Sequence, residues 1–522
     1  MKIINFLTIF FIIAIPVSSF AGTAYYVDCS SNTNGDGSYY NPWNTIEAVN
    51  QHSFQSGDDV YFKNNTTCKI NSDNDRLKIK WSGTSNDRVI IGSYDEKDDF
   101  ECGAVPHESG NRAIISGDNN SYPETNYSYP VRVYKQSYVT FQDIQFENIG
   151  KAGVSTTALF VESSDYIDVD NCYFYQSRGG LVYIKVENGT ISNSTFEQIG
   201  YPDWNGVGAA LELTSAYVDG ATHDITVTKN KVFDSKHEGI GLYKNVNGCI
   251  IEKNVVYNIR SYHIYNGASK NNIFRYNIVY EESNSRWSDP SSPQYKGSRS
   301  SFAFASGIEE TRSSERYNGY NEWYGNIVAG MRRGMSLSCV VESVNDYNDI
   351  VCHPNEKIYN NIFIDNDINI HLGTRTVGDS YEIKNNISII TNENLSSCKH
   401  TDRASATGTD WDNNIFYGGA ISGNAAKSAI TDNPKLTKMS GWRKIVGELT
   451  GNEFIPNSDS IAFTMGKYFE DHKKDRLHSV DFKSNPFSVS TTIATNEVIG
   501  AFFNNSTVEL KRVENVEISP LN

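Results

Sequence analysis

A short motif, asparagine followed by a run rich in apolar residues, recurs through the middle of this chain. A typical copy is Asn254-Val255-Val256-Tyr257. Nine copies begin at Asn171, Asn193, Asn230, Asn254, Asn277, Asn326, Asn361, Asn386 and Asn414. Four of the steps between these asparagines are 22 to 25 residues, and the longer steps indicate the same unit with insertions. A repeat of this length predicts a solenoid, because one unit is too short to bury a core alone.

The composition of each unit predicts what kind of solenoid forms. Short β-rich runs separated by Asn/Gly turns favour an all-β, single-stranded, right-handed parallel β-helix of ten to twelve coils. Coils would stack about 4.8 Å apart. The repeated Asn is expected at an inside corner, where its amide bonds the turn and the next Asn, and where Asn tolerates a left-handed bend. Leucine-rich repeats would need Leu spacing and helices that are missing. A β-sandwich would not keep one motif in phase over nine units.

The two ends of the chain differ from the repeats. Met1-Lys2, an apolar stretch to Val17 and the small-x-small site Ser19-Phe20-Ala21 predict a secretory signal peptide, too short to be a membrane anchor. We therefore expect a secreted protein, extracellular or periplasmic, without membrane association. A short helix near Trp43–Val49 is expected to cap the exposed end of the first sheet. The expected divisions are 1–21 (signal peptide), 22–130 (cap and first coils), 131–420 (regular coils, with a long insertion at 281–320) and 421–522 (irregular coils and cap).

Charge and cysteine content narrow the partners and the covalent structure. The net charge of −16 disfavours nucleic acid, although a local basic groove can still bind a polyanion. A monomer is expected. Export permits disulfides among the eight cysteines. The pair Cys339–Cys352 is the first choice and Cys29–Cys68 the second, with Cys102 competing for either. Cys172 and Cys249 lie within strand patterns, and we predict that both are buried thiols.

Both ends of the mature chain carry segments that are similar to a known group. The segments are Tyr25–Asp28, Gly35–Gly37, Asn41–Ile46, Ser56–Phe62, Ser82–Ser85, Ile90–Tyr94, Asp432–Lys435 and Val498–Phe502. Together they resemble the secreted right-handed parallel β-helix proteins of the pectate-lyase-like superfamily. That resemblance implies the fold and a carbohydrate-related role. The group includes polysaccharide lyases, glycoside hydrolases, uronan epimerases and members without known chemistry. None of its sharper catalytic motifs is present, so no catalytic residue is carried over.

One expected sheet would present an outward row of reactive side chains beside a groove. The row includes Tyr183, Lys185, Glu212, Tyr243, His263 and Tyr265, and the small residue Gly241 would leave room for a sugar ring. The catalytic candidates are His263, Arg260, Tyr243, Lys244, Glu238, His237 and Tyr265. The candidates for binding substrate are Asp203, Trp204, Tyr262, Arg332 and Arg333. Replacing His263 is expected to lower turnover and to leave stability almost unchanged.

Three functions fit this set of residues. In β-elimination of a uronic-acid polymer, Arg, Lys or Ca²⁺ neutralises the carboxylate, a base removes the α-proton, and Tyr or His protonates the leaving oxygen. Glu212 is either a calcium ligand or an idle surface charge. Hydrolysis instead needs two carboxylates, which Asp203, Glu212 and Glu238 could supply. We place a lyase acting on an acidic exopolysaccharide first, a glycoside hydrolase second, and a non-catalytic carbohydrate-binding surface or matrix protein third.

Overall fold

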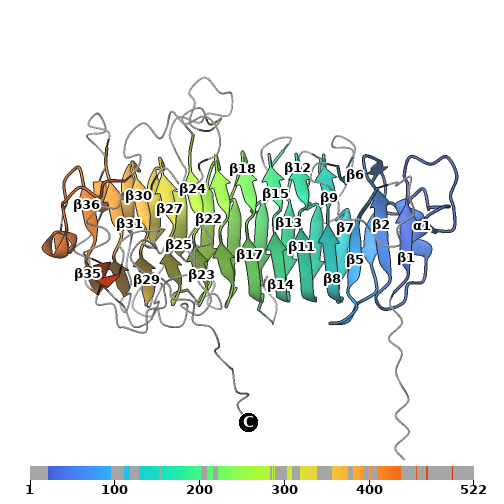
Figure 1. Cartoon of the computed structure of the whole chain (residues 1–522), viewed down its shortest axis with the longest axis horizontal. Helices are drawn as coiled ribbons and strands as arrows, with labels where there is room; N and C mark the ends of the chain where they lie inside the picture. The colour runs from blue at the N-terminus through green and yellow to red at the C-terminus, as the bar shows by residue number, and fades with distance from the viewer. Residues whose placement is uncertain are drawn as a thin grey trace, which may run out of the picture.

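Three long parallel sheets wind around one axis and form an elongated rod (Figure 1). The computed structural model describes residues 22–95, 111–117, 129–151, 154, 156–201, 208–215, 221–282, 285, 287, 302–307, 318–337, 355–373, 380–391, 399–402, 408–421, 423–436, 449, 454, 466–467 and 496–497. The expected signal peptide lies outside these residues. In the described part of the chain, no helix has both the length and the apolar character needed to cross a membrane.

Each coil gives one strand to each sheet, as the β-helix prediction requires. The 13-stranded sheet contains β1 (Ala24–Val27), β2 (Asp59–Lys63), β5 (Val89–Tyr94), β8 (Ser137–Gln142), β11 (Asp165–Asp170), β14 (Glu187–Ser192), β17 (His223–Thr228), β20 (Ile250–Glu252), β23 (Ile273–Arg275), β26 (Glu322–Tyr324), β29 (Glu356–Tyr359), β32 (Tyr381–Lys384) and β35 (Thr409–Asp412). The 12-stranded sheet contains β3 (Thr67–Lys69), β6 (Ala113–Ser116), β9 (Ile144–Glu147), β12 (Tyr173–Tyr175), β15 (Thr195–Glu197), β18 (Lys231–Phe233), β21 (Val255–Tyr257), β24 (Ile278–Tyr280), β27 (Ile327–Ala329), β30 (Ile362–Ile364), β33 (Ile387–Ile389) and β36 (Ile415–Tyr417). The 11-stranded sheet contains β4 (Leu77–Ile79), β7 (Val131–Tyr134), β10 (Leu159–Glu162), β13 (Leu181–Ile184), β16 (Leu211–Thr214), β19 (Ile240–Tyr243), β22 (Tyr262–Gly267), β25 (Phe302–Gly307), β28 (Arg333–Leu337), β31 (Ile368–Leu372) and β34 (Lys399–Asp402).

The N-terminal end of the rod is covered by the helix α1 (Ile46–Gln51) (Figure 1). The Thr45 side chain caps it by accepting a hydrogen bond from the Ala48 N–H at 3.2 Å. The side chains of Ile46 and Val49, on one side of the helix, are buried. At the other end lie the 3₁₀ helix η2 (Gly423–Ser428) and a short antiparallel pair, β37 (Gly466–Lys467) with β38 (Asn496–Glu497). The β25 strand falls inside the range expected to be the 281–320 insertion, so that range also contributes one regular strand.

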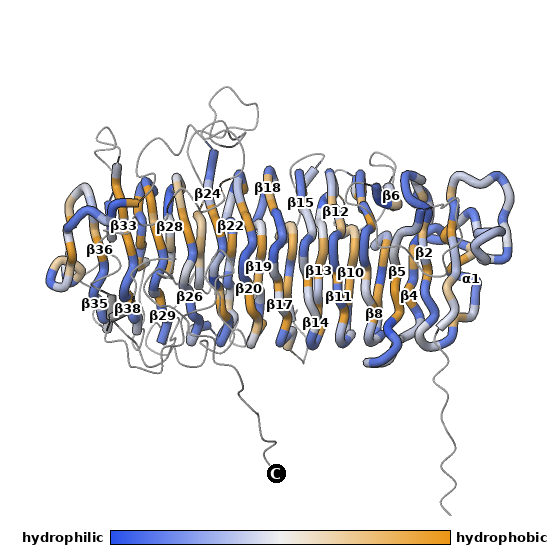
Figure 2. Tube along the Cα trace, viewed as in Figure 1, coloured by the Kyte–Doolittle hydropathy of each residue, from blue (hydrophilic) through white to orange (hydrophobic). Residues whose placement is uncertain are grey.

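Apolar residues alternate with polar ones along the strands and face the axis (Figure 2). Phe146, Phe174 and Phe196 occupy equivalent positions in β9, β12 and β15, and their rings stack at 4.9 and 4.5 Å between centroids. Such identical neighbours are buried on both sides by the coils above and below. The core is therefore one continuous column along the rod.

The asparagine ladder is present at an inside corner just before the 12-stranded sheet. Seven of the nine predicted residues form it: Asn230, Asn254, Asn277, Asn326, Asn361, Asn386 and Asn414. In each pair the Oδ1 of one Asn accepts from the backbone N–H and the Nδ2 of the Asn before it, at 2.9 to 3.1 Å. Each amide oxygen from Asn254 to Asn414 is thereby satisfied by the asparagine of the preceding repeat.

The prediction was wrong by one residue for the first two motifs. Ser194, and not Asn193, pairs with Asn230, and its hydroxyl accepts from the N–H of Cys172 at 3.0 Å. Asn171 and Asn193 lie one position earlier, with φ of 48° and 49°. The ladder and the left-handed bend were expected in one residue. They are instead split between adjacent positions, because an amide that faces the core cannot also occupy the outer bend.

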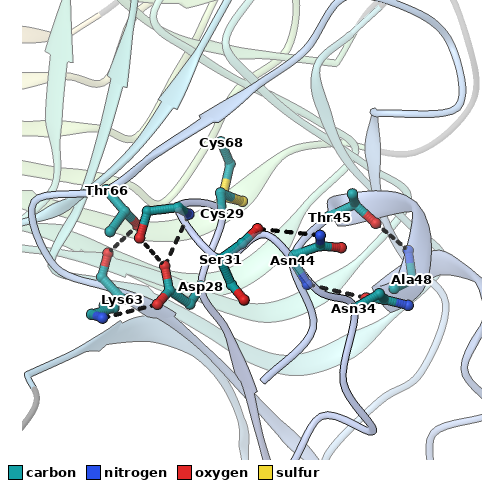
Figure 3. Close-up of a disulfide and its surroundings, with 11 residues drawn as sticks. Asp28, Cys29, Ser31, Asn34, Asn44, Thr45, Ala48, Lys63, Thr66 and Cys68 are labelled. Carbon is teal, nitrogen blue, oxygen red and sulfur yellow. Dashed lines mark hydrogen bonds and ion pairs between the residues drawn. A yellow bond between two sulfur atoms is a disulfide. The ribbon is translucent and has the colours of Figure 1, made fainter. Parts of the chain in front are cut away.

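A disulfide joins Cys29, after β1, to Cys68 in β3, with Cα atoms 5.3 Å apart (Figure 3). This was the second choice of pair, and it ties the first strand to the next coil. Beside it Lys63 forms an ion pair with Asp28 at 2.8 Å. Cys172 and Cys249 are buried thiols, as predicted. The first-choice pair, Cys339 and Cys352, lies outside the described residues.

Candidate functional site

The candidate site lies on the outer face of the 11-stranded sheet, where β16, β19 and β22 are adjacent. Glu212 in β16 pairs with Gly241 in β19, and Gly241 pairs with Tyr265 in β22. Tyr243 folds back over Gly241, since a Cβ added at Gly241 would lie 2.5 Å from Cε2 of Tyr243. The expected room for a sugar ring at Gly241 is therefore filled by the Tyr243 ring. Gly241 instead brings the Tyr243 hydroxyl toward the carboxylates.

Glu212 is a partly exposed carboxyl in this cluster. Burial, and then the negative charge of Glu238, raise its pKa from 4.5 to about 7. The Ala209 N–H donates to the Glu212 carboxyl and Lys244 lies near it, and both oppose the increase. Gly208 provides space for the carboxyl, because a side chain there would overlap it. Glu212 therefore keeps its proton up to about neutral pH.

Glu238 precedes β19 on the coil after Glu212. Its side chain hydrogen-bonds with Tyr243, whose hydroxyl donates to the carboxylate. Burial and the charges of Glu238 and Glu212 raise the pKa of Tyr243 well above its usual value. Two carboxyl groups from adjacent coils therefore meet at one protonated phenol. This arrangement supports acid–base chemistry, since the environments of the groups are unequal.

Aromatic rings continue from this cluster along the axis. Tyr265 stacks on Tyr262 with centroids 5.0 Å apart, and its ring is 5.4 Å from that of Tyr243. Tyr262 stacks in turn on Phe302 of β25 at 5.2 Å. Phe302 carries two cations, with the Arg332 and Arg333 guanidinium carbons 5.6 and 4.8 Å from its centroid. Arg332 and Arg333 are thus joined to the cluster by a row of rings.

The placement predicted for His263 is wrong. Its side chain is fully buried, and its position corresponds to Gly239, where an added Cβ would meet core atoms of Val256 and Ile259. Nε2 accepts from the Ile259 N–H at 3.3 Å, so Nδ1 carries the proton and donates to the Phe302 carbonyl at 3.3 Å. Burial lowers its pKa to about 3. His263 is a neutral core residue because the corner before β22 turns it inward.

Tyr183, expected outward, is also buried, and its hydroxyl donates to the Ile167 carbonyl at 3.0 Å. His237 and Arg260 are partly exposed residues of the turns before β19 and β22. Asp203 and Trp204 lie outside the described residues, so their roles stay predictions.

The match to a family model agrees with this architecture. A family described as the right handed beta helix region matches residues 129–302. This chain is a right-handed parallel β-helix. No curated protein matches its sequence.

Solved structures show the same β-helix at low identity. Pectate lyase Pel9A is similar over 93% of this chain and 97% of its own, with a TM-score of 0.53 and 13% identity. A rhamnogalacturonan lyase is similar over 87% and 98%, with a TM-score of 0.53 and 12% identity. The GH136 lacto-N-biosidase from Eubacterium ramulus covers 71% and 67%, with a TM-score of 0.39 and 13% identity. At these identities the likeness to the two lyases shows the fold alone.

A calcium ion at Glu212 was expected on the β-helix face. Calcium takes six to eight oxygen ligands, usually including several carboxylates. Among the described residues, no group of three acidic, His or Cys side chains is placed to hold a metal. Glu212 and Glu238 therefore do not make a calcium site by themselves, and calcium there stays a prediction.

Sequence reasoning missed Phe302 as part of the site. Only the strand register places its ring between Tyr262 and Arg333. The sequence did contain a clue. Tyr262 and Arg333 were both predicted to bind substrate, and Phe302 is the first residue of the strand that lies between their strands. Ser336 in β28, which the sequence placed in the same outward row, accepts a hydrogen bond from Arg333 at 3.2 Å.

Proposed function

We propose that this β-helix is an exported lyase that cleaves an acidic polysaccharide by β-elimination at Glu212, Tyr243 and Glu238. The observation that carries the proposal is the hydrogen bond between Tyr243 and Glu238 beside a carboxyl, Glu212, that keeps its proton near neutral pH. Two proteins of similar fold over most of this chain, pectate lyase Pel9A and a rhamnogalacturonan lyase, are polysaccharide lyases, which supports this reaction class.

β-Elimination needs a neutralised substrate carboxylate, a base and an acid. Protonated Glu212 can donate a hydrogen bond to the carboxylate of the sugar, which makes the α-proton more acidic. Lys244, which interacts electrostatically with Glu212, adds positive charge there. His263 cannot be the base, since it is buried. The remaining base in the cluster is the Glu238 carboxylate.

The Tyr243–Glu238 hydrogen bond lets the proton cross from base to acid. Glu238 takes the α-proton as the bond from the β-carbon to the leaving oxygen breaks and a carbon–carbon double bond forms. Tyr243 gives its proton to the leaving oxygen and recovers one from Glu238. The pair ends the step in its starting state. The raised pKa of Tyr243 is then no obstacle, because tyrosinate need not persist.

Hydrolysis is the second candidate, supported by one specific observation. The pKa of Glu212 is raised to about 7 beside a second carboxyl, Glu238, and a glycosidase needs one such carboxylic acid next to a second carboxyl group. Glu212 would protonate the glycosidic oxygen and Glu238 would act on the sugar or on water. The product would carry a new reducing end without a double bond.

A panel of acidic polysaccharides separates the two reactions. We expect an increase in ultraviolet absorbance from the unsaturated product together with new reducing ends. Reducing ends without the absorbance would overturn the lyase proposal in favour of hydrolysis. Binding without either signal would favour the non-catalytic alternative. Addition of chelator and then Ca²⁺ in the same assay tests the predicted calcium.

Two variants test the site itself. Glu238→Gln removes the base, and turnover should fall by about 10² or more. Gly241→Ala adds a Cβ where the Tyr243 ring lies, so the ring must move and turnover should fall by about tenfold or more. Glu187→Gln, an exposed carboxylate of β14 on the 13-stranded sheet, is the control and should keep parental activity. Unchanged turnover in both test variants would place the site elsewhere.

A further inference from the structure

A column of lysines follows the edge of the 11-stranded sheet on every second coil. Lys135, Lys185 and Lys244 are the residues immediately after β7, β13 and β19. Backbone hydrogen bonds align them: Lys135 N–H donates to Glu162, and Lys185 N–H donates to Thr214. Ser163 and Ser215 hold the same position on the intervening coils. Their backbone N–H groups donate in the same way, to the carbonyls of Ile184 and Tyr243.

The column has regular spacing because coils stack regularly. Two coils separate successive lysines, or about 10 Å, and Lys135 lies about 19 Å along the axis from Lys244. The three lysines share a left-handed backbone, with φ of 55°, 53° and 60°. Their side chains therefore leave the sheet at equivalent bends. Lys244 stands next to Glu212, so the column ends at the candidate site.

An exposed tyrosine marks the far end of the column. Tyr134 holds the strand position that Tyr243 holds four coils later, and it is 40% exposed. Arg132 Cζ and Lys135 Nζ lie 4.8 and 5.0 Å from its ring centroid. Glu162 pairs with Arg132 at 2.7 Å, so Lys135 is the cation expected to meet an added carboxylate.

The overall charge makes this column significant. A chain with net charge −16 repels an acidic polymer over most of its surface. Asp165 and Glu187 begin the strands that follow Ser163 and Lys185, where they contact Asn188 and His223. Three lysines in line therefore still offer a local path for a polyanion. Evenly spaced cations suit a polymer whose carboxylates repeat along its length.

We propose that Lys135, Lys185 and Lys244 form a binding track for a uronate-containing chain that runs along the β-helix axis, anchored at Tyr134. The track deepens the function proposed above and rests on it for the reaction, although binding can be measured without turnover. A substrate must then reach about 19 Å from the cleavage point toward the N-terminal end to use the whole track. Long polymers gain this contact and short oligosaccharides do not.

Binding is tested with a protein that does not turn over. In the Glu238→Gln background, the double change Lys135→Gln with Lys185→Gln should weaken binding of polygalacturonate or alginate by about five- to tenfold and reduce its salt dependence. The control is Lys229→Gln with Lys253→Gln, which removes two lysines of the same left-handed conformation (φ 57° and 55°) beside the 12-stranded sheet. Equal losses in test and control, or no loss in the test, would overturn the track.

The contribution of Tyr134 to binding is tested with a matched pair of variants. Tyr134→Ala should weaken binding of the long polymers, whereas Tyr166→Ala, with 37% exposure on the 13-stranded sheet, should not. A neutral polysaccharide should not respond to any of the lysine changes. An equal response would contradict recognition of carboxylates.

Kinetics of the otherwise parental enzyme separate the track from the reaction. The Lys135/Lys185 variant should raise KM for long polymers, leave kcat unchanged and leave short oligosaccharides unaffected. Parental kinetics on long polymers would sink the track and leave the proposed lyase intact. Lysine-dependent binding without cleavage by the parental protein would sink the lyase and support the track.

Discussion

Polar side chains form axial columns in two regions of this β-helix, the inside corner before the 12-stranded sheet and the outer face of the 11-stranded sheet. In the first, identical asparagines satisfy one another from Asn230 to Asn414. In the second, Glu212, Tyr243 and Glu238 differ in kind, and burial, followed by the neighbouring negative charges, raises the pKa of Glu212 and of Tyr243.

The difference between the regions is one of electrostatics. Neutral amides repeat without cost, because each is both donor and acceptor for the next. Adjacent carboxyls cannot both be charged without repulsion, so one of them keeps its proton. The first column stabilises the fold, and the second holds protons at defined atoms. Substitutions in the two regions should therefore affect different properties.

The largest effect on stability is expected from breaking the ladder. Asn277→Leu leaves the Ile251 carbonyl and the Asn254 N–H without their partners at 2.9 and 3.0 Å. Two buried polar groups without partners should cost about 2 to 6 kcal/mol of unfolding free energy. Denaturant unfolding measures it.

A serine at the same position is the matched comparison. Asn277→Ser should lose less, because the Ser194 hydroxyl already fills this position in an earlier coil and accepts from the backbone N–H of Cys172 on the coil before it. Equal losses for Ser and Leu would show that the hydrogen bonds of the ladder contribute little.

The next effect concerns His263, where the structure reverses the sequence-based expectation. His263→Ala should lower stability by about 2 to 4 kcal/mol, because it opens a cavity and leaves the Ile259 N–H without an acceptor. His237→Ala, a partly exposed neighbour, should barely change it. The folded pKa of about 3 lies below the unfolded value of 6.5, so His263 favours unfolding as pH falls through that range. A stable but inactive His263→Ala protein would restore His263 to the mechanism.

The smallest effect that we expect is a pH-dependent gain in stability when Glu212, on the outer face, is replaced. The pKa of Glu212 rises from 4.5 when unfolded to about 7 when folded, so the folded state binds more protons between these values and loses stability as pH rises through them. Glu212→Gln should match the parent near pH 4 and melt at a higher temperature near pH 8. Thermal unfolding at both pH values measures the difference. A parallel shift at both would contradict the raised pKa.

The sequence alone determined the β-helix, because its Asn motif returns once per coil and each coil must bury its apolar face on the next. It also placed Tyr243, Glu238, Tyr265 and Glu212 in successive coils. These predictions depend only on spacing and alternation, which the chain carries locally.

The tertiary structure decided what happens at corners and across coils. The alternation of inward and outward side chains fails at a bend. His263 therefore points inward, although alternation along its strand predicted that it would lie on the outer face. Asn171 and Asn193 occupied the bend and not the ladder, because one residue of slip changes what faces the core. The Tyr243 ring filled the gap over Gly241, and only this fold-back joins its hydroxyl to Glu238. Burial on the folded sheet, and then charges on adjacent coils, raise the pKa values of Glu212 and Tyr243. Neither cause can be recognised from the local sequence, because the interacting residues are far apart along the chain.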